Sequence, residues 1–242
     1  MEPEDASFKV FRYFNREEHR WAARSTFRVD NKSLDAFTGD PLVERIVAGI
    51  GARRATNIKE VCESFETWAR TRRRVRAPHM ADLCCGHGLT GLVFAAMERS
   101  VETVTLLDHN KPPKADLLVE AVCEAAPWAR AKVRWVEDRV ENACEHLVDG
   151  TAIVAVHACG VRTDRALEAA VAIKGHAAVV PCCYAQTGKK APRGLRDALG
   201  SRLATDVERT YELERHGWSV AWSAIPSAIS PMNRILIARA PS

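Results

Sequence analysis

From residue 79 onward, short apolar runs alternate with longer stretches whose apolar residues recur at helical spacing. The short runs are typical of buried β-strands, and the longer ones of helices packed on a sheet. We expect strands at 80–84, 103–108, 132–136, 152–157 and 177–182. Helices are expected near 89–99, 113–126, 139–148, 163–173 and 194–215. This alternation predicts right-handed crossovers and a parallel sheet.

Two further strand-like runs, 218–225 and 234–238, follow the last predicted helix. The segment that joins them, 226–233, contains no helical pattern, so the two strands are expected to pair antiparallel. The sequence therefore predicts an α/β fold with a Rossmann-like sheet of seven strands, five of them parallel, closed by an antiparallel C-terminal pair.

The first 78 residues follow a different, mostly helical pattern. Asp40 followed by Pro41 is typical of a helix N-terminus and predicts a short helix over 41–50. Between residues 57 and about 74, one apolar face recurs at positions 58, 61, 62, 65, 68 and 69, which predicts an amphipathic helix. We expect residues 1–78 to form an N-terminal extension and residues 79–242 to form the α/β domain.

The composition is that of an ordinary globular protein, with 242 residues, 47% hydrophobic and 27% charged. No apolar run approaches the ~20 residues that span a bilayer, so no membrane partner is expected. The acidic, polar start lacks the pattern of a secretory signal and favours a cytoplasmic location. The eight cysteines include two adjacent pairs but no C-x-x-C spacing. We therefore expect reduced thiols and no metal site.

Positive charge is concentrated in the N-terminal third. Residues 1–80 hold 16 Lys and Arg against 12 Asp and Glu, and the remainder is balanced. The excess peaks in a cluster of five arginines: Arg70, Arg72, Arg73, Arg74 and Arg76. Such a cluster is suited to the phosphates of a nucleic acid. It is equally typical of a solvated helix end, where cations complement the helix dipole.

A glycine loop carries the strongest chemical signal. Gly86 and Gly88 follow the first predicted strand and precede a helix, the context of a nucleotide-binding loop. Glycines let the backbone approach a ligand closely, and the helix behind them presents unsatisfied N–H groups. Asp108 lies twenty residues beyond Gly88, at the end of the second predicted strand, where an acid can accept both hydroxyls of a ribose.

The same spacing suits NAD and S-adenosylmethionine (SAM). Asp82 precedes Gly86 by four residues, as in the Asp/Glu-x-x-x-Gly-x-Gly loop of SAM enzymes, whose acid orients the methionine end. Tyr184 lacks the lysine four residues later that a short-chain dehydrogenase would show. Asp138, after the third strand, is placed to contact the adenine amino group, or to cap a helix. The pattern favours SAM.

Two cysteine-containing motifs follow the fourth and fifth strands, at the edge of the sheet where open α/β folds bind ligands. His157 and Cys159 end one strand and Asp164 opens the next helix; Cys182, Cys183 and Tyr184 end the other. We expect His157 to take a proton from an acceptor hydroxyl. A thiolate at Cys159 or Cys183 requires neighbours that depress its pKa. Singly, each residue is equally explained by packing or capping; jointly they favour catalysis.

The residues carry a family resemblance over about 79–242. The motifs are His-Ala-Cys-Gly-Val-x-Thr-Asp at 157–164, Pro-Cys-Cys-Tyr at 181–184 and Ser-Pro-Met-Asn-Arg at 230–234. They resemble the methyltransferase-like C-terminal part of the glutathione S-transferase C-terminal-domain-containing proteins. More distantly, they are similar to the tRNA acceptor-stem 2′-O-methyltransferases. The chain differs from the latter in lacking their zinc-finger segments and in having Tyr184 where they have histidine.

The resemblance implies a class I SAM-dependent methyltransferase, with Asp82, Gly86, Gly88 and Asp108 as cofactor contacts and Cys84 at the position of the usual first glycine. The leading hypothesis is methyl transfer to RNA, plausibly to a tRNA ribose hydroxyl, with the arginine cluster holding phosphates. Three alternatives are a small-molecule methyltransferase, a non-catalytic SAM- or RNA-binding module, and an NAD-dependent oxidoreductase.

Overall fold

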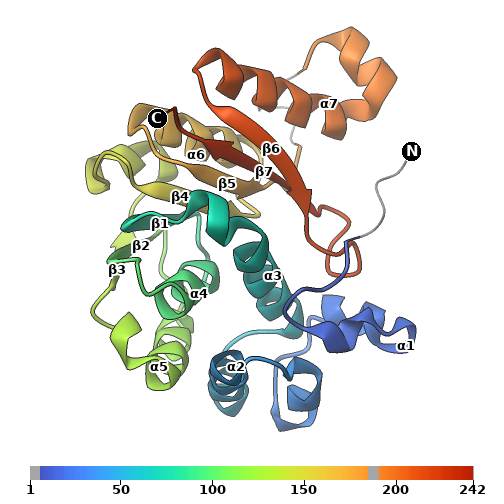
Figure 1. The fold of residues 1–242 in the computed structure, drawn as a ribbon, viewed down its shortest axis with the longest axis vertical. Helices are drawn as coiled ribbons and strands as arrows, with labels where there is room; N and C mark the ends of the chain where they lie inside the picture. The colour runs from blue at the N-terminus through green and yellow to red at the C-terminus, as the bar shows by residue number, and fades with distance from the viewer. Residues whose placement is uncertain (1–5, 185–190, 242) are drawn as a thin grey trace.

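A computed structural model describes residues 6–184 and 191–241 of the chain. Its centre is one seven-stranded sheet with the order β3-β2-β1-β4-β5-β7-β6 (Figure 1). The strands are β1 (His79–Leu83), β2 (Thr103–Asp108), β3 (Val133–Glu137), β4 (Ala152–Val156), β5 (Ala177–Val180), β6 (Ser219–Ala224) and β7 (Arg234–Arg239). β1 to β5 are parallel, and β7 pairs antiparallel with both β5 and β6. The predicted fold class is confirmed.

Helices cover both faces of this sheet. In Figure 1, α3 (Ile58–Val75), α4 (Leu89–Met97) and α5 (Ala115–Ala125) lie below it, while α6 (Val161–Ala172) and α7 (Arg193–Arg215) lie above it. Alternate strand residues supply the two cores: Met80 packs with the α3–α5 layer, and Ala81 with the α6–α7 layer. Burial on both faces explains why the strands read as continuous apolar runs.

The N-terminal residues form a further layer over α3 and α5. They fold into short helices, η1 (Arg12–Asn15), α1 (Glu17–Arg20), η2 (Trp21–Arg24) and η3 (Asn31–Phe37), followed by α2 (Pro41–Arg53). Asp40 caps α2 as predicted, accepting hydrogen bonds from the backbone of Leu42 and Val43. Phe11 packs edge-on against Phe65 of α3, and the two parts share one hydrophobic core. The boundary at residue 78 stays a prediction.

The predicted elements differ from the observed ones in two informative places. The segment expected as a helix over 139–148 is a 3-10 helix, η5 (Val140–His146). Its tighter turn accompanies hydrogen bonds that Asp138 accepts from the side chains of Asn142 and His146, which link the two ends of the segment. The predicted last helix is kinked at Gly200, which has a positive φ of 74°. Strand boundaries agree within two residues.

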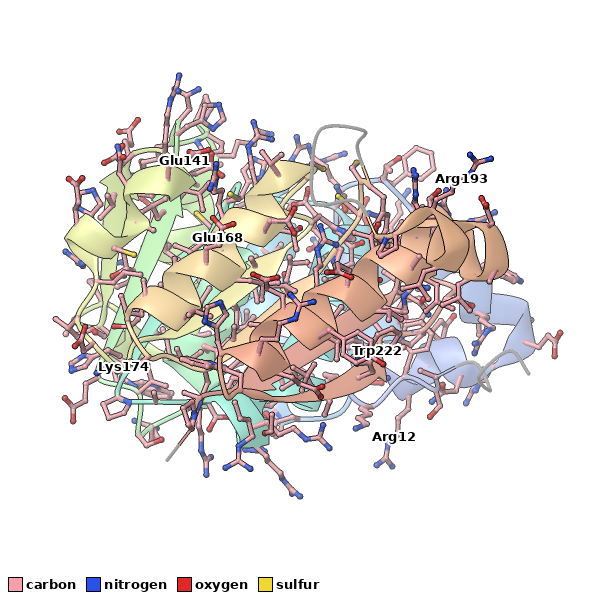
Figure 2. All side chains as sticks on the ribbon, turned by 90° about the horizontal axis from the view of Figure 1, so that it is seen from above. Arg12, Glu141, Glu168, Lys174, Arg193 and Trp222 are labelled. Atoms are coloured by element: carbon pink, nitrogen blue, oxygen red, sulfur yellow. The ribbon has the colours of Figure 1, made fainter. Side chains whose placement is uncertain are left out.

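The topology gathers the loops after β1, β2, β4 and β5 at one edge of the sheet, since parallel strands end at the same edge. We call this edge the rim. In Figure 2, Glu141 of η5 lies toward the top of the view, and Lys174, which follows α6, lies toward the bottom. The first half of α3 reaches the rim as well, because Glu63 of α3 bonds to His157 just beyond β4. The predicted functional residues therefore meet in one place.

Candidate active site

The loop after β1 has the backbone geometry of a ligand cradle. Gly86 has a φ of +55°, and a Cβ added there would meet no atom within 4 Å, so the loop leaves open space above its backbone. Gly91, one turn into α4, lies so close to β2 that a Cβ would stand 2.4 Å from Leu106. Gly86 therefore leaves room for a ligand, and Gly91 lets the N-terminus of α4 pack closely against the sheet.

Cys84 stands where SAM loops usually have a glycine, and its backbone explains that preference. Its φ is +54°, in the left-handed region that non-glycine residues enter at a cost. The thiol lines the cleft, and burial raises its pKa to about 12, so it is a neutral group. The departure from the family pattern is thus accommodated with local strain and without a new charge.

Asp108 lies at the end of β2 and faces the glycine loop. One carboxylate oxygen accepts a hydrogen bond of 2.8 Å from the backbone N–H of Gly86, and the other lies 2.7 Å from Nδ1 of His109. Asp108 and Asp138 line the same cavity of about 450 Å³, which we call the β2 cavity. The carboxylate therefore lies where the loop backbone and an adenosyl ribose would both be in reach.

Asp138 occupies the position expected after β3. It accepts hydrogen bonds from the Arg139 backbone, the Asn142 amide and His146, and these bonds, the one from His146 foremost, lower its pKa to about 2. Asp138 therefore precedes η5, whose N-cap is Arg139, and lines the β2 cavity. Its contact with the adenine stays a prediction.

Asp82 is almost completely buried beneath the glycine loop. Its carboxylate accepts a hydrogen bond of 2.8 Å from the backbone N–H of Gly91. Burial raises its pKa from 3.8 to about 7, partly offset by that bond. It lines a second cavity of about 290 Å³, the α3 cavity, together with Gly86 and the α3 residues Lys59, Glu63 and Ser64. A buried carboxyl of this kind suits a cationic ligand group.

His157 stands at the junction of the two cavities. Cys84 and His157 line both of them, so the β2 and α3 cavities form two sides of one cleft. His157 has a φ of +58°, again in the left-handed region. Cys84 and His157 follow the neighbouring strands β1 and β4. Backbone strain at two adjacent strand ends is a feature of functional sites.

Glu63 is a site residue that the sequence analysis missed. Its Oε1 lies 2.6 Å from Nε2 of His157 and 2.7 Å from Nζ of Lys59. Glu63 is only 4% exposed, and an acid so buried is rarely found without partners such as these. The signal in the sequence was the presence of acids among the apolar positions of a strongly amphipathic helix. No local pattern links residue 63 to residue 157.

The orientation of the imidazole changes the expected chemistry. Nε2 of His157 is held by Glu63, and Nδ1 is buried without a hydrogen-bond partner among the described residues. Because a carboxylate only accepts, Nε2 carries the hydrogen of this bond and has no free lone pair. A hydroxyl can therefore use His157 as its proton acceptor only at Nδ1, once the ring turns to expose that atom. The two residues act as a pair, with the carboxylate orienting the imidazole.

The remaining rim residues divide into two groups. Asp164 and Tyr184 do not face His157. Asp164 pairs with Arg209 at 2.7 Å, and the hydroxyl of Tyr184 donates to Asp206 at 2.6 Å. Asp206 also binds Arg209 and Arg234. This buried ion network joins α6, α7 and β7. The expected catalytic roles of Asp164 and Tyr184 are not supported by this geometry.

Cys159, Cys182 and Cys183 form the other group. The Sγ atoms of Cys159 and Cys182 are 2.8 Å apart, and those of Cys182 and Cys183 are 3.6 Å apart. Burial raises the pKa values of Cys159 and Cys182, which disfavours a thiolate at either position. Cys159 therefore does not have the activated form that a nucleophile requires.

The arginine cluster lies away from the cleft. Arg70 is buried and pairs with Glu66 while donating to the carbonyls of Ser7 and Ala224, so it offers no guanidinium to an external phosphate. Arg70 is therefore removed from the arginines that were expected to contact RNA. Arg72 and Arg76 pair with the buried Glu98. Arg73 and Arg74 are exposed, but at ~1.5 Å per residue Arg74 lies roughly 16 Å along α3 from Glu63.

Solved structures share the sheet. A protein designated as an rRNA methylase from Clostridium thermocellum matches with a TM-score of 0.50 at 15% identity, covering 74% of this chain and 96% of its own. Precorrin-6y C5,15-methyltransferase from Geobacter metallireducens GS-15 matches with a TM-score of 0.47 at 15% identity, covering 74% of this chain and 88% of its own. At this identity the first similarity shows the fold alone. No curated protein sequence gave a match.

No helix in the described parts of the chain has the length and apolar character needed to cross a membrane.

A family model described as a methyltransferase domain matches residues 53–190, more than half of the chain. The match begins before α3 and so includes Glu63 as well as the glycine loop and the rim. The chain belongs to this methyltransferase domain family, and is an enzyme that uses SAM as its cofactor.

Proposed function

We propose that this enzyme transfers the methyl group of SAM to RNA, at a ribose 2′-hydroxyl of a tRNA. The observation that carries the proposal is the division of one cleft into two cavities that meet at Cys84 and His157. The β2 cavity has Asp108 and Asp138, which suit the adenosyl group. The α3 cavity has Asp82, which suits the methionine ammonium, and the Glu63–His157 pair, which suits a hydroxyl. Their junction is where a methyl group would pass from cofactor to acceptor.

Residues of both cavities suit the cofactor. In the β2 cavity, Asp108 would accept hydrogen bonds from the ribose hydroxyls, and Asp138 would contact the adenine amino group. In the α3 cavity, Asp82, which is buried and accepts a hydrogen bond from the Gly91 backbone, would face the methionine ammonium. When bound, SAM supplies a methyl group already activated by a sulfonium, so the chain mainly has to position the acceptor in line.

The Glu63–His157 pair supports a hydroxyl as the acceptor atom. A hydroxyl has a high pKa and gains from a hydrogen-bond acceptor as its oxygen attacks the methyl carbon. Lys59 and His157 both contact Glu63, so the carboxylate fixes the imidazole at the cavity junction. In this proposal Nδ1 of His157 takes the proton of the acceptor hydroxyl, and the Glu63 carboxylate, bonded to Nε2, stabilises the resulting imidazolium.

Cations at the mouth of the cleft support RNA as the substrate class. Arg139 and Arg162 line the β2 cavity and are exposed, and Lys59 lines the α3 cavity. Phosphates on either side of a target nucleotide would meet these groups. Arg73 and Arg74 provide a second exposed basic site at the far end of α3, which a molecule as long as a tRNA could reach.

The test is mass spectrometry of nucleosides from cells with and without the gene, paired with transfer of labelled methyl from SAM to purified tRNA. We expect one 2′-O-methylated nucleoside to disappear with the gene and to be restored by the purified enzyme. An unchanged nucleoside profile, with label transferred to a small metabolite instead, would overturn the RNA assignment while leaving the enzyme class intact.

A further inference from the structure

Three cysteines from two separate loops converge at the rim. Cys159 lies on the loop after β4, and Cys182 and Cys183 lie on the loop after β5. Their three Sγ atoms all lie within 4.8 Å of one another. Neither loop alone shows a metal-binding spacing, which is why the sequence analysis expected none. Strand pairing between β4 and β5 creates the cluster.

We propose that Cys159, Cys182 and Cys183 bind one thiophilic d¹⁰ cation, Zn²⁺ in the reduced protein, and that this ion holds the β4 and β5 loops together at the rim. Three sulfur ligands at Zn–S distances of about 2.3 Å lie roughly 3.8 Å apart, so the observed cluster needs only small side-chain adjustments. Soft thiolate ligands select Zn²⁺ or Cu⁺ over Mg²⁺ or Ca²⁺.

The backbone around the cluster is already organised. The backbone N–H of His157 donates to Val180 at 2.9 Å, and that of Gly160 donates to Cys183 at 3.2 Å. Gly160 adopts φ 64° and ψ −130°, a conformation open to glycine, which turns the chain directly after Cys159. The three cysteines therefore lie on two loops that are hydrogen-bonded to each other, so binding of the ion needs little further ordering of the chain.

The exposure of the cluster suits reversible loading. Cys183 is exposed and the other two thiols are partly exposed, so an ion can enter from solvent. Three protein ligands leave a fourth tetrahedral position for water. Because the thiols bind the ion as thiolates, loading releases thiol protons to solvent and becomes tighter as pH rises.

The position of the ion gives it a defined task. Cys159 lies two residues from His157 and lines the β2 cavity, whereas Cys182 also contacts the carbonyl of His157 through its thiol. An ion on the three sulfurs would fix the loop that carries His157 relative to β5. The role is positional, and methyl transfer itself is not routed through the metal.

The experiment uses the full chain purified with a phosphine reductant, incubated with Zn²⁺ and freed of weakly bound metal by gel filtration. Elemental analysis is expected to find one Zn²⁺ per chain. Cys159→Ser, Cys182→Ser and Cys183→Ser should each lose most of it. Cys144→Ser, a matched change of an exposed cysteine outside the cluster, should retain it.

A second measurement keeps the test decisive if a variant fails to fold. The wild-type chain loaded with Co²⁺ should show intense thiolate-to-cobalt charge-transfer absorption, of the strength given by three Co–S bonds, and Zn²⁺ should displace it. Absence of this absorption, equal Zn²⁺ content in wild type and cluster variants, or an obligatory Cys159–Cys182 disulfide that persists in reductant would each overturn the proposal. A cuprous ion in place of Zn²⁺, lost in the same variants, would support the site.

Discussion

The glycine loop and the junction at His157 are assembled over very different distances in sequence. Around the loop, Gly86 and Asp108 bond across 22 positions, and Asp82 and Gly91 across 9. At the junction, Glu63 and His157 bond across 94 positions. The first set belongs to one strand–helix–strand unit, whereas the second needs α3 to be docked beside β4. The difference teaches that the proposed cofactor contacts are built locally in this chain, whereas the proposed acceptor site depends on the whole fold.

The largest expected effect is a loss of methyl transfer without a loss of SAM binding, which would separate the two regions. Glu63→Gln and His157→Asn should lower methyl transfer by about 10²–10⁴-fold, because each removes the proton-accepting pair, while SAM affinity stays unchanged. Asn tolerates the positive φ of residue 157, so the variant preserves the backbone. Single-turnover transfer and calorimetric SAM binding measure the two quantities. Wild-type transfer rates in both variants would remove the pair from the mechanism.

The next effect breaks the cofactor side. Asp108→Ala should weaken SAM binding by about 1–3 kcal/mol, because it removes the acceptor for the ribose and also frees the Gly86 N–H. Asp108→Asn retains an acceptor for Gly86 and should lose less. Calorimetry with SAM and S-adenosylhomocysteine measures both. Equal affinities for wild type and the alanine variant would place the ribose elsewhere.

A smaller effect concerns the pH dependence of cofactor binding. The pKa of Asp82, raised to about 7 by burial, falls when a cationic group binds beside it, so SAM binding near pH 7 should release a proton. Affinity should then rise about tenfold from pH 6 to pH 8, and Asp82→Asn should abolish this rise. Calorimetry in buffers of different ionisation enthalpy measures the proton. A pH-independent wild-type affinity would contradict the assignment.

The Asp82 carboxyl also gives a prediction for the ligand-free protein, whose stability should fall as pH rises. The folded pKa of Asp82 lies above its unfolded value of 3.8, so the folded state favours the protonated form. Its contribution to stability is full below pH ~4 and is lost as pH rises through about 7. Chemical denaturation of wild type and Asp82→Asn across this window should show a steeper fall for wild type.

The smallest effect probes local strain. Cys84→Gly should raise the free energy of unfolding by up to about 1 kcal/mol, since glycine adopts the positive φ without strain. Cys85→Gly is the matched control: Cys85 is not among the positive-φ residues and packs partly against the core, so its loss should destabilise. Thermal unfolding compares the two. A destabilised Cys84→Gly would mean that the thiol contributes packing that outweighs the strain.

Sequence patterns anticipated the fold because the apolar runs and their spacing are local properties. The antiparallel pair β6 and β7 was predicted from the absence of a helix between them, and the structure confirms it. The helix expected over 139–148 was wrong in type: the segment is a 3-10 helix in which Asn142 and His146 bond back to the Asp138 carboxylate. Such side-chain competition with the backbone is invisible to periodicity.

Within the candidate site, the sequence placed correctly those residues whose partners lie nearby in the sequence. Asp82, Gly86 and Asp108 were located from spacing, and the structure brings them to one cleft. Asp164 and Tyr184 were grouped with His157 because their strand ends are adjacent. Strand adjacency fixes where a backbone ends and leaves open which way a side chain turns, and both side chains turn to the ion network around Asp206.

By itself the sequence determined a parallel sheet, its antiparallel closure and a glycine loop with an acid at the next strand end, because each depends on residues that follow one another along the chain. Only the tertiary structure decided that Glu63 holds His157, that Arg70 is buried, and that three cysteines from two loops meet. Contacts of this second kind require segments to be packed together, and packing is set by the fold as a whole rather than by any local pattern.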